Sequence, residues 1–293
     1  MRGVLKTILA SIGAFFLAII FISLIIALLT KEASVQFGDK VAVVEVDGII
    51  TDPTSVNDEL RYYGERADVK AIIIRINSPG GGVGPSQEIY SEIKRLRETK
   101  KVVASMGAVA ASGGYYIAAA ADKIVANPGT ITGSIGVIIE FVNVEDLLKK
   151  IGLKGYTIKS GRFKDIGSPI KEMEPEEKEL LQEVVNDVYG QFVEAVSSGR
   201  NIPREEVEKI ADGRILSGAQ AKKAGLVDSL GTLQDAITIG ASLAGIKGKP
   251  VVIYPERRRG IWRVLFEDSS LTRIAAEFMP GMRIMYLLPD LAH

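Results

Sequence analysis

Hydrophobic positions in the chain alternate between short continuous runs and longer amphipathic stretches. Runs rich in β-branched residues occur at 40–50 (KVAVVEVDGII), 70–77 (KAIIIRIN) and 101–106 (KVVASM). Such runs, bounded by charged residues and by glycine or proline, are typical of central strands in a parallel sheet. Residues 85–99 (PSQEIYSEIKRLRET) have the spacing of an amphipathic helix. The alternation predicts an α/β fold with a parallel-sheet core covered by helices.

Two more helices are predicted in the second half of the chain. A long surface helix from Glu174 to about Ser197 carries an apolar stripe formed by Leu181, Val184, Val185, Val188, Phe192 and Val196. The segment 217–228 (SGAQAKKAGLVD) predicts a compact helix with Ser217 as its N-cap and Gly225 as its stop. Residues 256–278 mix basic and aromatic residues. We expect this segment either to lie on a membrane or a neighbouring subunit, or simply to dock on the domain.

The N-terminal segment predicts a membrane anchor. Residues 8–29 contain no charge and no proline, and a helix of this length spans a hydrocarbon core of roughly 30 Å. A cleaved signal peptide is the alternative, but its apolar region is usually shorter and ends in an A-x-A-like site that we do not find. Arg2 and Lys6 precede the span, whereas Lys31 and Glu32 cancel after it. We therefore expect a single-pass protein of the cell membrane, with a cytoplasmic N-terminus and the remaining chain on the extracytoplasmic side.

Composition excludes several function classes. The 293 residues carry 36 basic and 36 acidic side chains, so no net charge favours nucleic acid. There is no cysteine, which excludes disulfides, thiol nucleophiles and cysteine-ligated metals. The single histidine, His293, is the last residue, where order is hard to guarantee. A Ser-His-Asp triad and a histidine-ligated zinc site are therefore both rejected, and we expect no metal and no cofactor.

Two glycine-rich segments indicate a nucleophilic serine. Ser112 lies between a run of small residues and two glycines, at the start of an alanine-rich helical stretch whose free N–H groups could hold an oxyanion. Capping that helix is the plainer role for Ser112. The loop 77–86 (NSPGGGVGPS) follows a predicted strand and could present further N–H groups at the same sheet edge. It does not fit a phosphate loop, because no G-K-[ST] follows, although a simple turn stays an alternative.

The base for this serine has to be found among the lysines. With histidine excluded, a lysine kept neutral by apolar surroundings is the remaining general base, as in Ser-Lys variants of the catalytic triad. Residues 156–169 (YTIKSGRFKDIGSP) offer Lys159 and Lys164 between glycines. Lysines in such loops are ordinarily exposed, and the residues alone do not decide between the two.

Four motifs in this order and spacing resemble the signal peptide peptidase A proteases in their short, single-repeat bacterial form. They are INSPGGG, GAVAASGGYYIAAAADKIVANPGTITGSIGV, IKSGRFKDIGSP and GRILSGAQAKKAGLVDSLG, and the resemblance runs from about residue 40 to 245. It implies that Ser112 is the nucleophile and Lys164 the general base. It also implies an oxyanion hole from the N–H groups of Gly81 and Gly113, with the hydroxyl of Ser134 steadying the lysine.

The resemblance also implies a fold, an assembly and a substrate class. The fold would be that of the ClpP and crotonase superfamily, and the assembly a homo-oligomeric ring in which adjacent subunits supply serine and lysine. Substrates would be apolar peptides such as signal peptide remnants. The expected organisation is a cytoplasmic N-terminus and anchor at 1–32, a tether at 33–40, a Ser-Lys protease domain at 41–254 and a tail at 255–293.

Three alternatives stay open on the sequence. A membrane Ser-Lys protease of the stomatin-partner type is the nearest. A crotonase-like enzyme acting on acyl-CoA thioesters would share the oxyanion geometry, but the anchor and the segment 159–169 argue against it. A catalytically inactive ring-forming scaffold is disfavoured by the intact Ser112 and Lys164.

Overall fold

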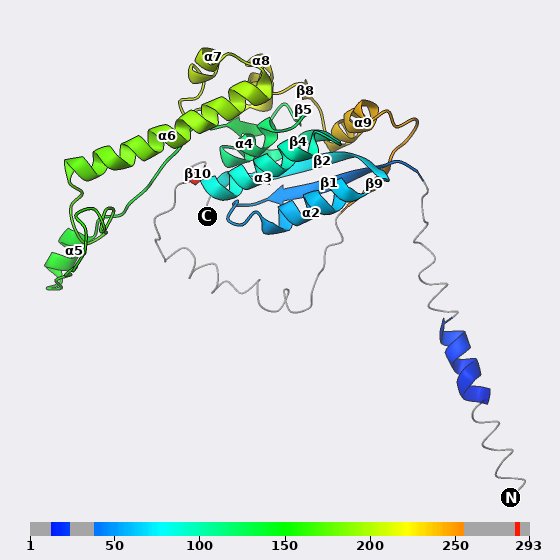
Figure 1. Cartoon of the computed structure of the whole chain (residues 1–293), viewed down its shortest axis with the longest axis horizontal. Helices are drawn as coiled ribbons and strands as arrows, with labels where there is room; N and C mark the ends of the chain where they lie inside the picture. Colours follow the sequence, from blue (N-terminus) through cyan, green and yellow to red (C-terminus); the bar gives the residue numbers. More distant parts are fainter. Residues whose placement is uncertain (1–12, 24–37, 255–284, 288–293) are drawn as a thin grey trace, which may run out of the picture. The chain divides into compact units, whose positions relative to one another are not determined.

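The computed structural model describes residues 13–23, 38–254 and 285–287 (Figure 1). The chain divides into two compact units, Met1–Gly38 and Asp39–His293. In the first unit, residues 13–23 are helical. The other positions of the predicted span 8–29 lie outside the described residues, and no helix among the described residues has the length and apolar character needed to cross a membrane.

The second unit is built on a parallel-dominated sheet. Within the described residues the strand order is β7-β6-β4-β2-β1-β9, with β5 pairing both β4 and β8. Every pair is parallel except β6 with β7. The predicted α/β class with a parallel sheet is thereby confirmed. The strands are β1 Lys40–Asp47, β2 Val69–Ser78, β4 Lys101–Ala111, β5 Lys123–Ala126, β6 Ile131–Gly133, β7 Ile215–Ser217, β8 Ser229–Leu230 and β9 Val251–Ile253.

Helices cover both faces of the sheet, which explains why its strands are apolar without interruption. Alternate residues of β1 belong to two separate buried clusters. One cluster includes residues of α2, α3, α4 and α6, and the other is closed by α9. The helices are α2 Thr54–Glu65, α3 Val83–Leu96, α4 Gly113–Ala119, α5 Glu145–Lys150, α6 Pro175–Arg200, α7 Arg204–Glu208, α8 Gly218–Lys223 and α9 Leu233–Leu243.

The predicted helix starts and stops are largely confirmed. Ser217 caps α8 by accepting a hydrogen bond from the Gln220 N–H, and Gly225 follows the helix with a φ of 78°. The long helix α6 begins at Pro175, as expected, but runs three residues beyond Ser197 to Arg200. Its second half is buried against the core, whereas Val184 in the first half of the same stripe is 41% exposed.

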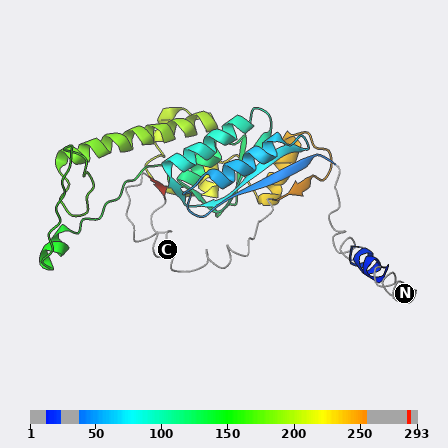
Figure 2. The same cartoon turned by 60° about the horizontal axis from the view of Figure 1, so that its bottom comes forward.

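A projecting segment separates β6 from α6. Residues 140–174, here called the arm, contain α5 and no buried residue. In Figures 1 and 2 the arm lies at the N-terminal end of α6, beyond the edge of the sheet. Every hydrogen bond and ion pair of the arm within the described residues ends inside residues 143–178. The arm is therefore held by its own contacts and the first turn of α6.

Two short strands lie apart from the main sheet. β3 (Gly80–Gly82) follows β2, and β10 (Met285–Leu287) pairs with it antiparallel. The predicted tail segment 256–278 lies outside the described residues.

Candidate active site

Ser112 occupies the tight junction between β4 and α4. Its backbone angles are φ 52° and ψ −117°, which is a conformation that favours glycine. The Ser112 N–H donates to the Gly133 carbonyl at 2.8 Å, and its own carbonyl accepts from the Tyr116 N–H at 2.8 Å. A serine in such a conformation costs about 1–3 kcal/mol, and strain of this kind is common at functional positions.

The structure contradicts the interpretation of Ser112 as a helix cap. Although Ser112 stands at the N-cap position of α4, its side chain makes no capping hydrogen bond. Ser217, by contrast, uses its hydroxyl to cap α8. The Ser112 hydroxyl is thus left free of the ordinary structural role of a serine at this position.

The loop after β2 packs directly against the start of α4. A Cβ on Gly113 would lie 3.3 Å from the Gly81 nitrogen and 2.6 Å from the Ser86 hydroxyl. A Cβ on Gly81 would collide with the backbone of Ile50. Both positions therefore require glycine, and the backbone of Gly81 lies next to the helix start. The first backbone hydrogen bond of α4 runs from the Tyr116 N–H to the Ser112 carbonyl. The N–H groups that precede Tyr116 in the helix therefore have no partner within it.

Strand β3 has a different neighbour on each edge. On one edge the Ile50 N–H donates to Gly80 at 2.9 Å, and the Gly82 N–H donates to Ile50 at 2.8 Å. Because successive residues of a strand point their backbone groups to opposite sides, Gly81 faces the other edge. There Tyr286 of β10 is its partner in the antiparallel register. An extended segment therefore lies along the edge that carries Gly81.

Ser134 lies one residue from the backbone that holds Ser112. It has a φ of 50° and is 5% exposed, and its N–H donates to the Arg214 carbonyl at 2.8 Å. Arg214 also binds both carboxylate oxygens of Asp212, at 2.7 and 2.6 Å. Hydrogen bonds from Arg214 lower the pKa of Asp212 to about 2. The carboxylate beside Ser134 is thus ionised, and a bound guanidinium balances its charge.

The structure separates the two candidate lysines. The Lys159 amine lies 2.6 Å from the Asp165 carboxylate and 2.7 Å from the Arg162 carbonyl, so it is engaged inside the arm. Lys164 is exposed, and no hydrogen bond or ion pair of its amine occurs among the described residues. Both belong to the arm. Ser112, Gly81, Gly113 and Ser134 thus gather at the sheet edge, whereas Lys164 is not joined to them within one chain.

Sequence reasoning missed the turn 212–214. Its Gly213 N–H donates to the Ile135 carbonyl at 3.1 Å, so the turn supports the segment that follows Ser134. The signal was present, because residues 213–218 (GRILSG) open one of the four motifs. The sequence of this motif does not indicate a role for Arg214. Its position beside Ser134 depends on the fold.

The geometry and two sequence families define the class of this protein. A strained serine at the start of a helix, beside first-turn N–H groups that have no partner within the helix, is an arrangement suited to nucleophilic hydrolysis. The Clp protease family model matches residues 24–130, which agrees with the parallel-dominated α/β fold. The model of Peptidase family S49 matches residues 94–247. The protein is a protease, and the chain belongs to peptidase family S49.

Individual relatives carry protease names. A protein of Synechocystis sp. named as a protease is 50% identical over 71% of this chain and 75% of its own length. A protein of Methanocaldococcus jannaschii, also named as a protease, is 37% identical over 84% of each chain. A protein of Enterococcus faecium named as signal peptide peptidase SppA is 39% identical over 68% of this chain and 62% of its own length. The resemblance to signal peptide peptidase A is thereby confirmed.

Proposed function

We propose that the protein is a serine endopeptidase with the dyad Ser112 and Lys164, which degrades cleaved signal peptides and other apolar peptides at a membrane. The observation that carries this proposal is the backbone of Ser112. It is held in a glycine-type conformation beside Gly81 and Gly113, and its hydroxyl does not cap the helix. Membership of peptidase family S49 supports the same reaction class.

In the proposed reaction, the neutral Lys164 amine removes the proton of the Ser112 hydroxyl while the hydroxyl oxygen attacks a peptide carbonyl carbon. The N–H groups of Gly81 and Gly113 stabilise the negative oxygen of the tetrahedral intermediate. The protonated lysine then donates its proton to the leaving amine as the C–N bond breaks. A water molecule, deprotonated by the same lysine, hydrolyses the acyl-enzyme and restores Ser112.

The exposed position of Lys164 favours an assembly in which the dyad forms between copies. A lysine that acts as a base has to be neutral, and apolar surroundings are what disfavour its charged form. Among the described residues of one chain, Lys164 is exposed. We therefore propose a homo-oligomeric ring in which the lysine of one copy serves the serine of the next. Ser134, whose backbone is fixed beside Ser112, would accept a hydrogen bond from the ammonium or donate one to the amine.

Strand pairing at β3 favours a peptide substrate over an acyl thioester. β10 pairs with the edge that carries Gly81, so this edge accepts an extended backbone. A peptide bound in the same antiparallel register would bring its carbonyl groups to the N–H groups beside Ser112. A relative named as a signal peptide peptidase supports apolar leader remnants as the substrate class.

Membrane attachment is part of the proposal. Residues 8–29 would form the anchor, with the domain 41–254 on the extracytoplasmic side, the tether 33–40 between them and a tail from 255. The described helical residues 13–23 support this role, because their large side chains are exposed and apolar, among them Phe15 at 65% and Phe21 at 64%. Retention in the membrane fraction after alkaline extraction would test the anchor.

Activity of paired variants tests the dyad. The full-length chain in detergent would be assayed on fluorogenic peptides and a synthetic signal peptide. We expect Ser112→Ala and Lys164→Arg to lose several orders of magnitude in kcat, because arginine stays protonated and cannot act as a base. Lys159→Arg is the matched control, because it keeps the charge that pairs with Asp165. Equal losses in the two lysine variants, or cleavage surviving in Lys164→Arg, would refute the assignment.

A further inference from the structure

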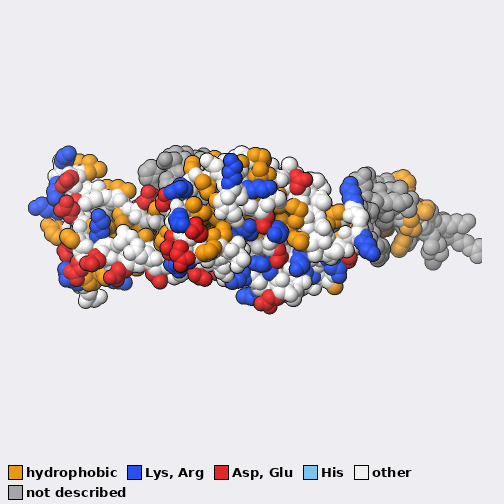
Figure 3. Space-filling view, turned by 90° about the horizontal axis from the view of Figure 1, so that it is seen from above, with side chains coloured by type: hydrophobic (Ala, Val, Ile, Leu, Met, Phe, Trp, Pro, Cys, Tyr) orange, Lys and Arg blue, Asp and Glu red, His pale blue; other side chains and the backbone are white. Residues whose placement is uncertain are grey.

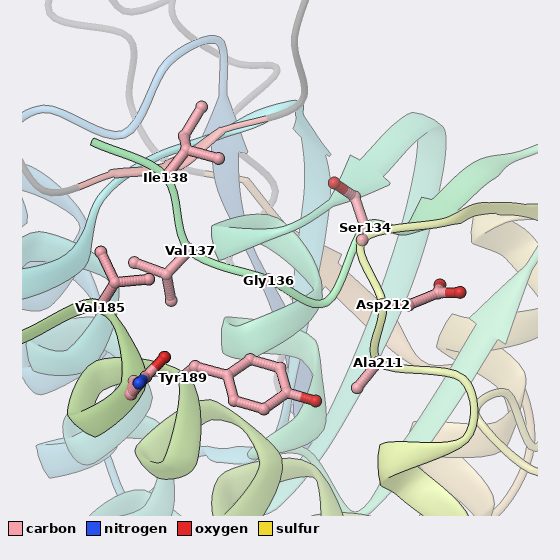
Figure 4. Close-up of a pocket in the computed structure, with 10 residues that line it drawn as sticks. Ser134, Gly136, Val137, Ile138, Val185, Tyr189, Ala211 and Asp212 are labelled. Atoms are coloured by element: carbon pink, nitrogen blue, oxygen red, sulfur yellow. The ribbon is translucent and has the colours of Figure 1, made fainter. Parts of the chain in front are cut away.

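A cavity of about 450 Å³ lies beside Ser134 and has no assigned occupant. It opens between α6, the segment after β6 and the loop 211–213, and Figure 4 shows Val137, Val185 and Tyr189 facing one another across it. Its size is within the range of specific binding pockets, and its lining is largely apolar. Asp212 and Asn186 supply polar groups at the lining.

The arm carries large apolar side chains that are exposed in the part of the chain that the structure describes. Tyr156 is 85% exposed and Ile158 is 103% exposed, and they are two positions apart in an extended stretch in which residues 151–160 are all exposed. Figure 3 shows hydrophobic side chains lying among charged ones over this part of the molecule. An exposed group of large apolar residues without a core indicates a surface that binds a partner.

The first half of α6 forms one wall of the cavity, and part of its apolar stripe is exposed among the described residues. Val185 lines the cavity, and the neighbouring Val184 is 41% exposed. This half of the helix also carries Glu179, Glu183 and Asp187. Residues 151–162 of the arm contain three basic side chains and no acidic one. Lys159 is paired with Asp165 and Arg162 with Glu174 of the arm and Glu176 of α6, which leaves Lys154, two positions before Tyr156, available to the acidic wall.

The chain between Ile158 and Lys164 is long enough to extend from the cavity to Ser112. Ile158 and Lys164 are six positions apart, so an extended chain between them spans at most about 20 Å. On the receiving side, Val137 lies four residues after Gly133, whose carbonyl binds the Ser112 N–H. If the arm of one copy binds in the cavity of a second copy, the first copy's Lys164 can therefore lie near the second copy's Ser112.

From these observations we propose that Tyr156 and Ile158 of one copy dock into the cavity of a second copy beside its Val185, and that this contact brings the first copy's Lys164 to the second copy's Ser112. The inference rests on the proposed Ser-Lys function and adds the surface through which the copies join. The contact is heterologous, because arm and cavity are different surfaces of the same chain, and contacts of this type build rings when the rotation between successive copies closes.

Mixed assemblies test the docking contact and the dyad separately. Two differently tagged full-length copies would be co-expressed and purified together in detergent. One copy carries Lys164→Ala and supplies only the serine, whereas the other carries Ser112→Ala and supplies only the lysine. With random mixing, about a quarter of the contacts join a serine to a lysine, so activity should return to about a quarter of the unsubstituted level.

The docking variants are then placed in one copy at a time. We expect Val185→Glu to lower activity at least about tenfold in the serine-supplying copy and far less in the lysine-supplying copy. Tyr156→Asp should show the opposite dependence. Because each variant is examined in both copies, a general folding defect would appear as a loss in both. Leu243→Glu on α9 and Leu147→Asp on α5, which introduce charge at exposed apolar positions that do not line the cavity, are the matched controls.

Two results would overturn the inference in different ways. An inactive mixture of the Lys164→Ala and Ser112→Ala copies, without any docking variant, would refute the dyad between copies, and the docking contact with it. An active mixture in which Val185→Glu and Tyr156→Asp act equally in either copy, or act no more than their controls, would leave the dyad standing and refute the cavity as the docking site.

Discussion

The strained backbone of Ser112 predicts that the nucleophile lowers the stability of the fold. With φ 52° and ψ −117°, any residue with a Cβ is unfavourable here, and the cost is about 1–3 kcal/mol. Ser112→Gly removes this strain, whereas Ser112→Ala keeps it. Glycine loses more backbone entropy on folding than alanine, which offsets about 0.5–1 kcal/mol of the gain in stability. The glycine variant should therefore unfold with a free energy about 1 kcal/mol higher than the alanine variant.

Denaturant unfolding of the compact unit Asp39–His293 measures this difference. Both variants lack the nucleophilic hydroxyl, so the comparison isolates the backbone, and both should be inactive. For a unit of this size about 1 kcal/mol corresponds to a rise in Tm of roughly 2–4 °C. If Ser112→Gly unfolds at the same denaturant concentration as Ser112→Ala, or at a lower one, the serine is not strained and the argument from its conformation fails.

Other contacts give predictions that one variant each can test. Gly113→Ala should lower kcat by about 100-fold or more with a smaller change in KM, because its Cβ would lie 3.3 Å from the Gly81 nitrogen and displace the oxyanion donors; an unchanged kcat would contradict this. Gly199→Ala should destabilise the fold by at least about 1 kcal/mol in thermal unfolding, since its Cβ would meet the Ala119 backbone of α4. Gly190→Ala on the same helix has room, and should stabilise by about 0.5–1 kcal/mol; equal effects would refute the packing argument. Burial raises the pKa of Asp228. The hydrogen bond from the Ile124 N–H and the cations Arg200 and Lys123 lower this pKa by more, so it lies below 3.8. Its stabilisation is therefore present above that pH and lost as pH falls through the lowered value, so Asp228→Asn should cost about 1–3 kcal/mol at pH 7 and progressively less in acid.

The central strands and the main helices followed from the hydrophobic pattern because the sheet is buried on both faces. The same reasoning ended β4 too early, at residue 106. The strand continues to Ala111 because Val109, Ala110 and Ala111 pair with β6. Small residues that are held by a neighbouring strand carry no β-branched signal of their own. Helix α2 was not predicted, since Pro53 stands at its N-cap and no side chain caps it.

The candidate site was only partly accessible to sequence reasoning. The two glycine-rich segments indicated Ser112 as the nucleophile. Its backbone conformation, in which the side chain does not cap the helix, depends on the junction between β4 and α4. The choice between Lys159 and Lys164 needed the family resemblance. Lys159 forms an ion pair with Asp165 in a loop that has no periodic sequence pattern, so the sequence could not predict this contact. The pairing of β10 with β3 joins segments about 200 positions apart, which no local pattern can reveal.

A chemical substitution of the Lys164 amine tests directly whether this amine is the base for Ser112. The chain contains no cysteine, so Lys164→Cys introduces a single thiol that 2-bromoethylamine converts into a lysine analogue with a sulfur in its side chain. The sulfur makes the amine less basic. We predict that Lys164→Cys is inactive, that alkylation restores cleavage, and that kcat/KM then rises with pH through a lower apparent pKa than in the unsubstituted protein. Activity that is the same before and after alkylation, or a restored pH profile that does not move, would contradict it.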